Sequence, residues 1–533
     1  MDLPKFLQLA LDELESGAPA KCLKICDEIL AEEPGLTQAL YLRGCAAFET
    51  GEFTQAVSDL DIVYGNHPEH LQAAFYLGRS LRATGSFEEA LEPLQAALSV
   101  AEFAVVAHYE LAACLSRLRR RSEAIDHYCA ILTLQPDYAQ VAANLASLLE
   151  RENRLEEAAY WIRQALQLSP DNETALMTRA TLNRRNGEYS LAAEGLRQLI
   201  PAISNPINRS IAWNQLGNCL EGQEEWDEAF NAFTESNRVL IEHHESSRPD
   251  PRGPQGLQTL ARIHEWLTAN PMADWTEPAT PDAGGIAFLV GFPRSGTTLL
   301  DRMLSAHPDI EVLEEKSLFS DLHQDWSQHG TLESLVDVND AQIADARDIY
   351  RRAMSRHRKK PQQSLVIDKL PLNLTYLFLV QRLFPEAPVI FLQRHPVDVC
   401  ISCYFQAFEL QASMGYFLDL HATSQYYDAV MRVASLSTDQ IGNPTHQLRY
   451  EDLVAEPDVR LRALIKFLDL QWHDSILESW QDDAETSDTP SYQQVSQPLY
   501  TRSIGRWQHY SRQLEPCLSV LQPWVTRFGY PEV

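Results

Sequence analysis

The stretch Gly284-Gly-Ile-Ala-Phe-Leu-Val-Gly-Phe-Pro-Arg-Ser-Gly-Thr-Thr-Leu299 decides the fold of the carboxyl-terminal half of the chain. Its apolar run, residues 286–290, is bounded by glycines and predicts a buried strand, while the apolar positions from residue 299 onward have helical spacing. Glycines in the connecting loop let the backbone fold closely around an anion, and the amino end of the new helix supplies N–H groups and a positive dipole. We therefore predict a strand, a phosphate-binding loop and a helix.

The loop differs from the P-loop of nucleoside triphosphatases at one informative position. Gly291, Gly296 and Thr298 match that motif, but Thr297 stands where the motif has Lys, and the cation is Arg294 inside the loop. Kinases and ATPases use the Lys together with Mg²⁺ on the terminal phosphates. The sequence therefore argues against a kinase that uses a nucleoside triphosphate. The alternative is a glycine-rich turn that binds no ligand.

Composition limits the partners of the chain. The 533 residues include 74 acidic and 44 basic side chains, a formal net charge of −30. Such a surface repels nucleic acid and anionic membranes, so an anionic cofactor needs a local cluster of cations. The nine cysteines show neither zinc-site nor disulfide-framework spacing, and we find no signal-peptide or membrane-span pattern. We expect a cytoplasmic protein of two or more domains, with no metal, no nucleic acid and no membrane.

Three sets of residues recur every 34 positions in the first half of the chain. Small side chains occupy Cys22, Ala56, Ala90, Ala124, Ala158 and Ala192. Prolines stand at positions 34, 68, 136 and 170, and further small residues at 44, 78, 112, 146 and 180. This period is typical of tetratricopeptide (TPR) repeats, of which we count about seven. We predict an all-α TPR superhelix whose concave face binds a polypeptide acceptor or partner protein; alternatively, the array only supports assembly.

Helix-breaking residues divide the chain further. The segment 246–254 is rich in Ser and Pro, residues 257–267 form an amphipathic helical pattern, and a second spacer covers 278–285. We predict a repeat array over 1–245, a linker with one helix over 246–283, and an α/β domain over 284–533. Strand and helix patterns alternate in that domain, which predicts a mainly parallel sheet with ligands at the carboxyl ends of its strands.

A second cation follows one of these predicted strands. Arg394 comes directly after the apolar run 389–392, and Ser402 lies about two helical turns further on. A guanidinium group at a strand end can make a forked contact with phosphate, to which a hydroxyl can add a hydrogen bond. The alternative for Arg394 is a surface ion pair with Asp398.

The Pro-Arg-Ser-Gly-Thr-Thr loop of residues 293–298 resembles the 5′-phosphosulfate loop of sulfotransferases, and Arg394 with Ser402 resembles their 3′-phosphate site. These enzymes use 3′-phosphoadenosine 5′-phosphosulfate (PAPS) without a metal. The domain is most similar to tyrosylprotein sulfotransferases, and with its repeats the chain resembles the TPR-sulfotransferase proteins of bacteria. The resemblance implies an α/β, P-loop-like domain that moves the sulfuryl group of PAPS to a hydroxyl.

The resemblance also assigns residues. For the cofactor it implies Arg294, Ser295, Gly296, Thr297 and Thr298 at the 5′-phosphosulfate, Arg394, Ser402 and Arg506 at the 3′-phosphate, and Tyr450 near the nucleotide. For catalysis it implies Glu315 as the base, Lys369 on the bridging oxygen, and Ser491 assisting transfer. Without the family, the Glu314–Glu315 pair would be interpreted as an acidic surface turn and Lys369 as a strand-end lysine that reaches solvent.

Two departures from the family pattern bear on the acceptor. Ser317 stands where tyrosylprotein sulfotransferases have an Arg that engages acidic acceptors, and Gln406 stands where they have a basic residue. Use of PAPS is therefore better supported than tyrosine as acceptor. The rival hypotheses are sulfation of a small molecule or glycan, with repeats that serve assembly, and a TPR adaptor whose nucleotide site is inactive.

Overall fold

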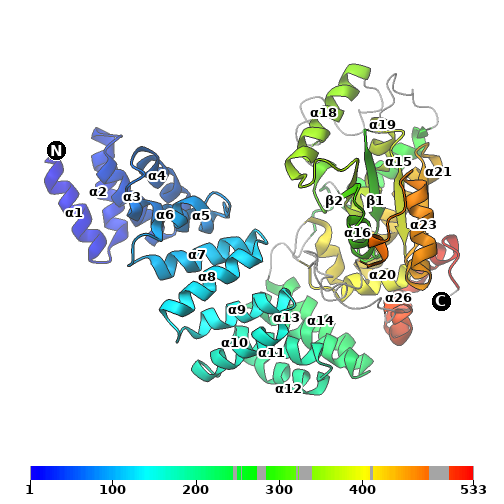
Figure 1. Cartoon of the computed structure of the whole chain (residues 1–533), viewed down its shortest axis with the longest axis horizontal. Helices are drawn as coiled ribbons and strands as arrows, with labels where there is room; N and C mark the ends of the chain where they lie inside the picture. The colour runs from blue at the N-terminus through cyan, green and yellow to red at the C-terminus, as the bar shows by residue number, and fades with distance from the viewer. Residues whose placement is uncertain are drawn as a thin grey trace. The chain divides into compact units, whose positions relative to one another are not determined.

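The computed structural model describes residues 2–243, 249–253, 255–272, 284–319, 322, 339–408, 412–478 and 503–531. The chain divides into two compact units, Met1–Asn186 and Gly187–Val533 (Figure 1). Within the described residues of the first unit, all regular elements are helices. Its helices are α1 (Leu3–Glu15), α2 (Pro19–Glu32), α3 (Thr37–Thr50), α4 (Phe53–Asn66), α5 (Leu71–Thr84), α6 (Leu91–Ala97), α7 (Ala104–Arg117), α8 (Arg121–Leu134), α9 (Ala139–Arg151), α10 (Leu155–Leu168) and α11 (Glu173–Arg185).

The columns of small residues lie where neighbouring helices touch. All six members of the Cys22 column are at most 1% exposed. A Cβ added to Gly44 would lie 2.6 Å from Leu60 Cγ, and one added to Gly78 would lie 2.5 Å from Leu94 Cγ. No larger side chain fits at Gly44 or Gly78 without displacing the neighbouring leucine, so the paired helices approach closely there.

The second unit begins with three more repeat helices. These are α12 (Tyr189–Leu199), α13 (Pro206–Gly222) and α14 (Trp226–His243), with the short helix η1 (Ile200–Ala202) between the first two. Residues 3–243 are thus the all-helical TPR region that the period predicted. The division at 186/187 falls inside the predicted repeat domain, because α13 and α14 pack against the α/β domain. The domain limits 245 and 284 stay predictions.

Among the described residues, the α/β part contains one sheet of five strands. They are β1 (Ile286–Gly291), β2 (Ile310–Glu314), β3 (Leu365–Lys369), β4 (Val389–Gln393) and β5 (Thr445–Arg449). Their order is β2-β3-β1-β4-β5, and every neighbouring pair is parallel. The prediction of a mainly parallel sheet is confirmed.

The α-helices around the sheet are α15 (Leu257–Ala269), α16 (Thr297–Ser305), α18 (Asp340–His357), α19 (Leu377–Leu383), α20 (Pro396–Tyr404), α21 (Leu420–Gln440), α22 (Tyr450–Ala455), α23 (Pro457–Phe467), α24 (Ser475–Glu478) and α26 (Ser511–Arg527). Three short helices are η5 (Pro371–Tyr376), η6 (Ala412–Leu418) and η8 (Arg506–Tyr510).

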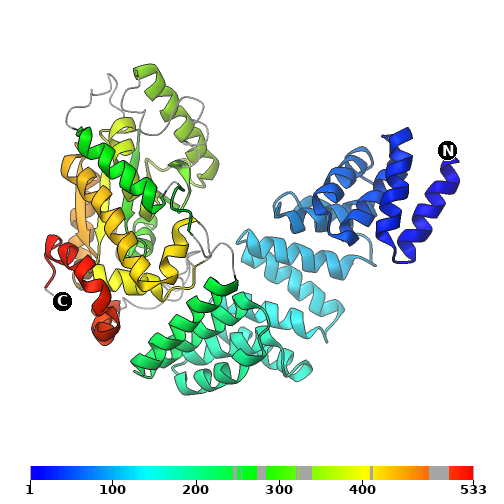
Figure 2. The same ribbon diagram turned by 180° about the vertical axis from the view of Figure 1, so that it is seen from behind.

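Helices cover both faces of the sheet. Ala287 and Leu289 of β1 share one apolar cluster with residues of α16 and α23. Phe288 points to the opposite face, because side chains alternate along a strand, and its ring lies 6.3 Å from that of Tyr350 on α18. On this second side α15 packs along α21 (Figure 2). Within the described residues, no helix is both long and apolar enough to cross a membrane.

The strand order places a topological switch point at the end of β1. From this central strand the chain first builds β2 and β3 on one side and then β4 and β5 on the other. The connections after β1 and β4 therefore leave the sheet in opposite directions, which opens the ligand-binding crevice of doubly wound folds. All five strands are parallel, so their carboxyl ends bring the predicted site residues to one edge.

Substituting Gly78 tests the close packing of the repeats. In Gly78→Ala the new Cβ meets Leu94, and overpacking costs about 1–3 kcal/mol against a helix-propensity gain of about 1 kcal/mol. We expect a net loss of stability in chemical unfolding of the full chain. The matched control is Gly65→Ala on α4, where a Cβ meets nothing within 4 Å and a small gain is expected. Equal stability of the two variants would contradict this packing.

Candidate anion-binding and catalytic site

The loop between β1 and α16 has a backbone that needs its glycine. Gly296 has φ +101°, and a Cβ there would lie 2.3 Å from the Tyr450 ring. Arg294 also has a positive φ, +69°, an uncommon conformation for a residue with a side chain. The loop therefore holds Arg294 in an unusual backbone conformation just before the amino end of α16, where backbone N–H groups can bind an anion.

Two arginines contact each other at this loop, through the side chain of one and the backbone of the other. Arg294 Nε donates to Ser402 Oγ at 3.2 Å, and Arg394 Nη1 donates to the carbonyl oxygen of Arg294 at 2.9 Å. Burial, with a smaller contribution from the positive charges of Arg394 and Arg506, lowers the pKa of Arg294 to about 10. The structure thus concentrates like charges in a place with little water. A bound anion would relieve their repulsion.

Two buried polar atoms in this region have no hydrogen-bond partner among the described residues. Ser295 Oγ and Arg394 Nε make no hydrogen bond to any described residue. Buried polar groups are nearly always satisfied, so such atoms point to a missing ligand. A hydroxyl and a guanidinium N–H are donors that suit a phosphate or sulfate oxygen. The residues present therefore fit an anionic cofactor.

A segment near the carboxyl end of the chain closes this region. Arg394 donates a second hydrogen bond to the Ser503 carbonyl, and Tyr450 Oη lies 2.9 Å from Ser503 Oγ. The Arg394 guanidinium also lies 5.1 Å from the centroid of the Tyr450 ring. Asp398 accepts from the backbone N–H groups of Gly505 at 2.7 Å and Trp507 at 2.9 Å. Asp398 is thus engaged by backbone and is not simply an ion-pair partner of Arg394.

The ends of β2 and β3 carry a cluster of opposite character. Lys369 is fully buried, and its Nζ lies 3.3 Å from a carboxylate oxygen of each of Asp301, Glu314 and Glu315. Burial disfavours the ammonium form, but the carboxylates of Asp301, Glu315 and Glu314 outweigh burial and raise the pKa of Lys369. Burial raises the pKa of Asp301 to about 6 despite the attraction of Lys369. Lys369 is therefore a permanently charged, precisely held cation and does not reach solvent as a surface lysine would.

Glu315 combines a fixed backbone with an accessible side chain. Its N–H donates to the Lys369 carbonyl at 2.7 Å, which extends the pairing of β2 and β3 by one residue. Its φ of +51° turns the chain away from the sheet at this point. The side chain is 41% exposed while one oxygen remains on Lys369. A carboxylate in this position can take a proton from a group that approaches from solvent.

The structure gathers most residues that the sequence singled out. Arg294, Arg394, Ser402 and Tyr450 meet around the loop, while Glu315 and Lys369 meet at the neighbouring strand ends. Ser295, Gly296, Thr297 and Thr298 form the loop and the first turn of α16. Ser491 lies outside the described residues, so its role stays a prediction.

Arg506 has a partner that the sequence did not reveal. Its Nε and Nη2 donate to the carboxylate of Glu221 on α13, and its guanidinium lies 4.9 Å from the centroid of the Phe405 ring. Its predicted contact with the 3′-phosphate stays untested. Asp301 was also missed. Its only sequence signal is its position one turn into α16, where a buried carboxylate needs a cation such as Lys369.

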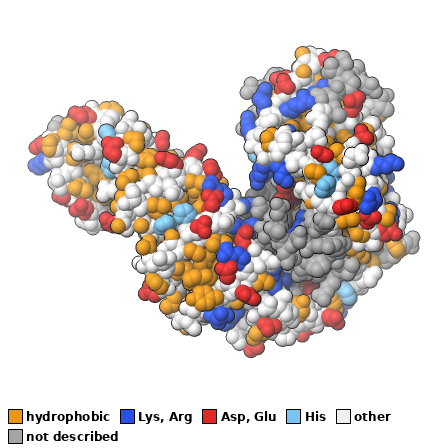
Figure 3. All heavy atoms as spheres, viewed as in Figure 1, with side chains coloured by type: hydrophobic (Ala, Val, Ile, Leu, Met, Phe, Trp, Pro, Cys, Tyr) orange, Lys and Arg blue, Asp and Glu red, His pale blue; other side chains and the backbone are white. Residues whose placement is uncertain are grey.

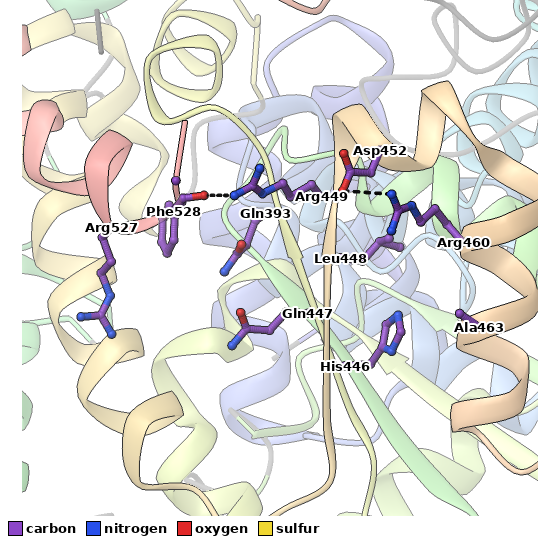
Figure 4. A pocket seen from close by; sticks show the side chains of 11 residues that line it. Gln393, His446, Gln447, Leu448, Arg449, Asp452, Arg460, Ala463, Arg527 and Phe528 are labelled. Carbon is purple, nitrogen blue, oxygen red and sulfur yellow. Dashed lines mark hydrogen bonds and ion pairs between the residues drawn. The ribbon is translucent and has the colours of Figure 1, made fainter. Parts of the chain in front are cut away.

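Two other surfaces carry arginines. A hollow of about 440 Å³ beside β5 contains none of the predicted site residues, and in it Arg449 bonds the Phe528 carbonyl while Arg460 pairs with Asp452 (Figure 4). Lysine and arginine side chains also gather on the face of the second unit that carries α18 (Figure 3). Arg351, Arg352 and Arg356 line a shallow depression there. Among the described residues, no group of three or more His, Cys, Asp or Glu is placed to hold a metal.

Comparison with known proteins assigns both parts of the chain. Residues 287–474 match the sulfotransferase family, and residues 41–104 and 109–173 match the tetratricopeptide repeat. Protein-tyrosine sulfotransferase 1 of Danio rerio is 25% identical over 264 residues, which cover 46% of this chain and 72% of that protein. The chain thus combines TPR repeats with a sulfotransferase domain that is distantly related to protein-tyrosine sulfotransferases.

Other relatives differ in extent. An uncharacterized protein of Aquifex aeolicus is 26% identical over 344 residues, which cover 61% of this chain but only 43% of that protein. Among solved structures, YrrB, described as a TPR protein with an unusual peptide-binding site, is 20% identical with a TM-score of 0.31 and covers 33% of this chain and 90% of that chain.

The buried carboxyl group of Asp368, the residue before Lys369, should make the stability of the protein depend on pH. Asp368 Oδ2 accepts from Tyr350 Oη at 2.6 Å and Asn373 Nδ2 at 3.1 Å, but burial outweighs these bonds and raises the pKa of Asp368 from 3.8 to about 7. The folded state therefore binds this proton more tightly than the unfolded state. Consequently the contribution of Asp368 to stability falls as pH rises from about 4 to about 7.

We expect Asp368→Asn, which cannot ionise, to lose less stability than the wild type as pH rises. Thermal unfolding of both proteins between about pH 5.5 and 7.5 measures the difference, which should shift in favour of the variant as pH increases. Parallel pH profiles would show that Asp368 keeps an ordinary pKa.

Proposed function

We propose that the chain is a PAPS-dependent sulfotransferase that transfers the sulfuryl group to a hydroxyl. The observation that carries this proposal is the meeting of Arg294 and Arg394 at the ends of β1 and β4, with two buried donors left without a described partner. A nucleotide with phosphate at both its 3′ and 5′ positions suits a site in which two cations lie on adjacent strand ends. The sulfotransferase family match supports the same cofactor.

The residues divide between the two ends of the cofactor. The loop from Arg294 to Thr298 and the amino end of α16 would hold the 5′-phosphosulfate, and Arg394 with Ser402 would hold the 3′-phosphate. Tyr450 would lie near the nucleotide, since its ring covers Gly296 and faces Arg394. When bound, PAPS supplies the sulfuryl group and leaves as 3′-phosphoadenosine 5′-phosphate (PAP).

Glu315 and Lys369 would act on the acceptor side. Glu315 accepts the hydroxyl proton, and Lys369 supplies a fixed positive charge for the oxygen that becomes negative. Their contact of 3.3 Å keeps both groups at one place before any ligand arrives. Asp301 and Glu314 also contact the Lys369 ammonium, and these two ion pairs help to hold it in place. We propose Ser491 as a third residue that assists transfer.

The repeats would present a polypeptide acceptor, such as a tyrosine peptide, or recruit a partner protein. The TPR match supports this role, since stacked helix pairs suit extended chains. All nine cysteines are free thiols, which supports action in the cytoplasm. Sulfation of a small phenol or a glycan is the competing proposal, in which the array serves assembly.

Calorimetric titration of the full chain with PAP tests the cofactor. We expect binding that is independent of Mg²⁺ and much tighter than binding of ATP, because the site has cations for a 3′-phosphate. Arg394→Ala should weaken the binding of PAP at least about tenfold, which is the loss of affinity expected for a charge-assisted contact. Arg527→Ala is the matched control, since Arg527 lies in the separate hollow beside β5 and pairs with Asp439. Preference for Mg-ATP would contradict the proposal.

Replacing the proposed base tests the chemistry. Glu315→Gln should lower turnover by about 10²- to 10⁴-fold, since general-base catalysis contributes that much, and should leave PAP affinity nearly unchanged. The assay follows transfer from radiolabelled PAPS to a panel of tyrosine peptides, small phenols and oligosaccharides. Glu314→Gln is the control, because Glu314 also contacts Lys369 and should cause a smaller loss. Equal losses in the two variants would argue that the carboxylates only hold Lys369.

A further inference from the structure

The segment Ser503–Tyr510 joins the last TPR helices to the candidate cofactor site. Its first residues contact Arg394, Asp398 and Tyr450, as described above. Its last residues contact α13 and the start of α14. Both sets of contacts lie within the second compact unit. The segment therefore has one side on the anion site and the other on a repeat.

Glu221 is the centre of the contacts on the repeat side. Its two carboxylate oxygens pair with Arg506, with Nε at 2.7 Å from Oε1, and Oε1 also accepts from Tyr510 Oη at 2.6 Å. The side chains of Glu221 and Arg506 are only 15% and 16% exposed. A bidentate pair that is largely withdrawn from water fixes the orientation of both groups.

Aromatic contacts hold the same junction from both sides. The Trp226 and His509 rings stack with centroids 3.9 Å apart, and Phe233 stacks on Phe405 at 4.1 Å. Asn237 donates to the carbonyl of Tyr404, the last residue of α20, and Asn214 donates to that of Phe405. The helix that carries Ser402 thus ends on the last repeat, so the repeat supports two elements of the candidate site.

Because Arg506 is committed to Glu221, its position is set by the repeat. The positive charge of Arg506 still acts on Arg294, whose pKa it lowers. The Ser503 carbonyl, held in the same segment, receives a hydrogen bond from Arg394 and so orients that guanidinium. A change at Glu221 would therefore reach Arg394 through the Arg506 side chain, the backbone of residues 503–506 and the Ser503–Arg394 hydrogen bond.

We propose that Glu221 is a positioning residue of the sulfotransferase site, which acts by fixing the Ser503–Tyr510 segment and through it the Arg394 guanidinium. The last repeat is then part of the nucleotide site and not only of a recruitment surface. This inference rests on the proposed function, since it concerns the same cofactor. It goes beyond that function because it assigns a role in nucleotide binding to a residue of the TPR region.

Nucleotide titration of the full-length variants Glu221→Ala and Glu221→Gln tests the proposal. The probes are PAP and adenosine 5′-phosphate, which lacks the 3′-phosphate that Arg394 would hold. We expect Glu221→Ala to weaken the binding of PAP at least about tenfold and the binding of adenosine 5′-phosphate much less. Glu221→Gln should have an intermediate effect, because its amide oxygen still accepts a hydrogen bond. A general loss of structure would weaken both nucleotides equally. If Glu221→Ala does not fold, Glu221→Gln decides the test.

Asp227→Ala is the matched control. Asp227 also joins α14 to the same region, through Arg512 and Gln513, and its removal takes away one negative charge as well, but its contacts are exposed. We expect both nucleotides to bind this variant as they bind the wild type.

Each alternative outcome is decisive. Glu221 variants that bind PAP as Asp227→Ala does would overturn the positioning role and leave the proposed function standing. Tighter PAP binding in them would show that Glu221 competes with the cofactor for Arg506, which also overturns it. Failure of the wild type to bind PAP would instead refute the proposed function itself.

Discussion

The close approach of Arg294 and Arg394 at the ends of β1 and β4 is the constraint on which the rest of the site depends. Burial and, to a smaller extent, the neighbouring charge of Arg394 disfavour the charged form of Arg294, and its pKa is lowered accordingly. The fold holds them with neutral acceptors, namely Ser402 Oγ and the carbonyl oxygens of residues 294 and 503. The cations are therefore in position before a ligand arrives. Preorganised charge of this kind costs no rearrangement when an anion binds, and the repulsion that it relieves adds to affinity.

The ends of β2 and β3 show the opposite arrangement, a single buried ammonium among three carboxylates. The two clusters share one edge of the sheet because all strands are parallel and β1 lies between β3 and β4. A cationic half that suits an anionic donor thus adjoins a half with an accessible carboxylate. This polarity fits a transfer in which a proton leaves the acceptor on one side while negative charge develops on the other. Burial of Lys369 suits this role, because water around the ammonium would screen its electric field and allow the side chain to move.

Local patterns in the sequence predicted the helices and strands, but they did not predict contacts between residues that are far apart in the chain. The 34-residue period located the repeats because each close approach, such as Gly78 against Leu94, demands a small residue at one position. Apolar runs located β1 and β4, and the residues that follow them could be named because strand ends converge in a parallel sheet. Glu221 had no such signal, since it lies on a repeat helix 285 residues before Arg506. Asp301 looked like any polar helical residue. The packing boundary at 186/187 was hidden for the same reason, because it depends on side chains of α13 and α14 that meet α20 and the Ser503–Tyr510 segment.

Hydrogen–deuterium exchange of the full chain with and without PAP shows where the nucleotide acts, and so tests whether the two arginines and the last repeat form one binding site. We expect slower exchange in four places together: the loop after β1, the Arg394–Ser402 stretch, the Ser503–Tyr510 segment and the end of α13 around Glu221. Protection confined to the hollow beside β5, with the loop after β1 unchanged, would contradict it.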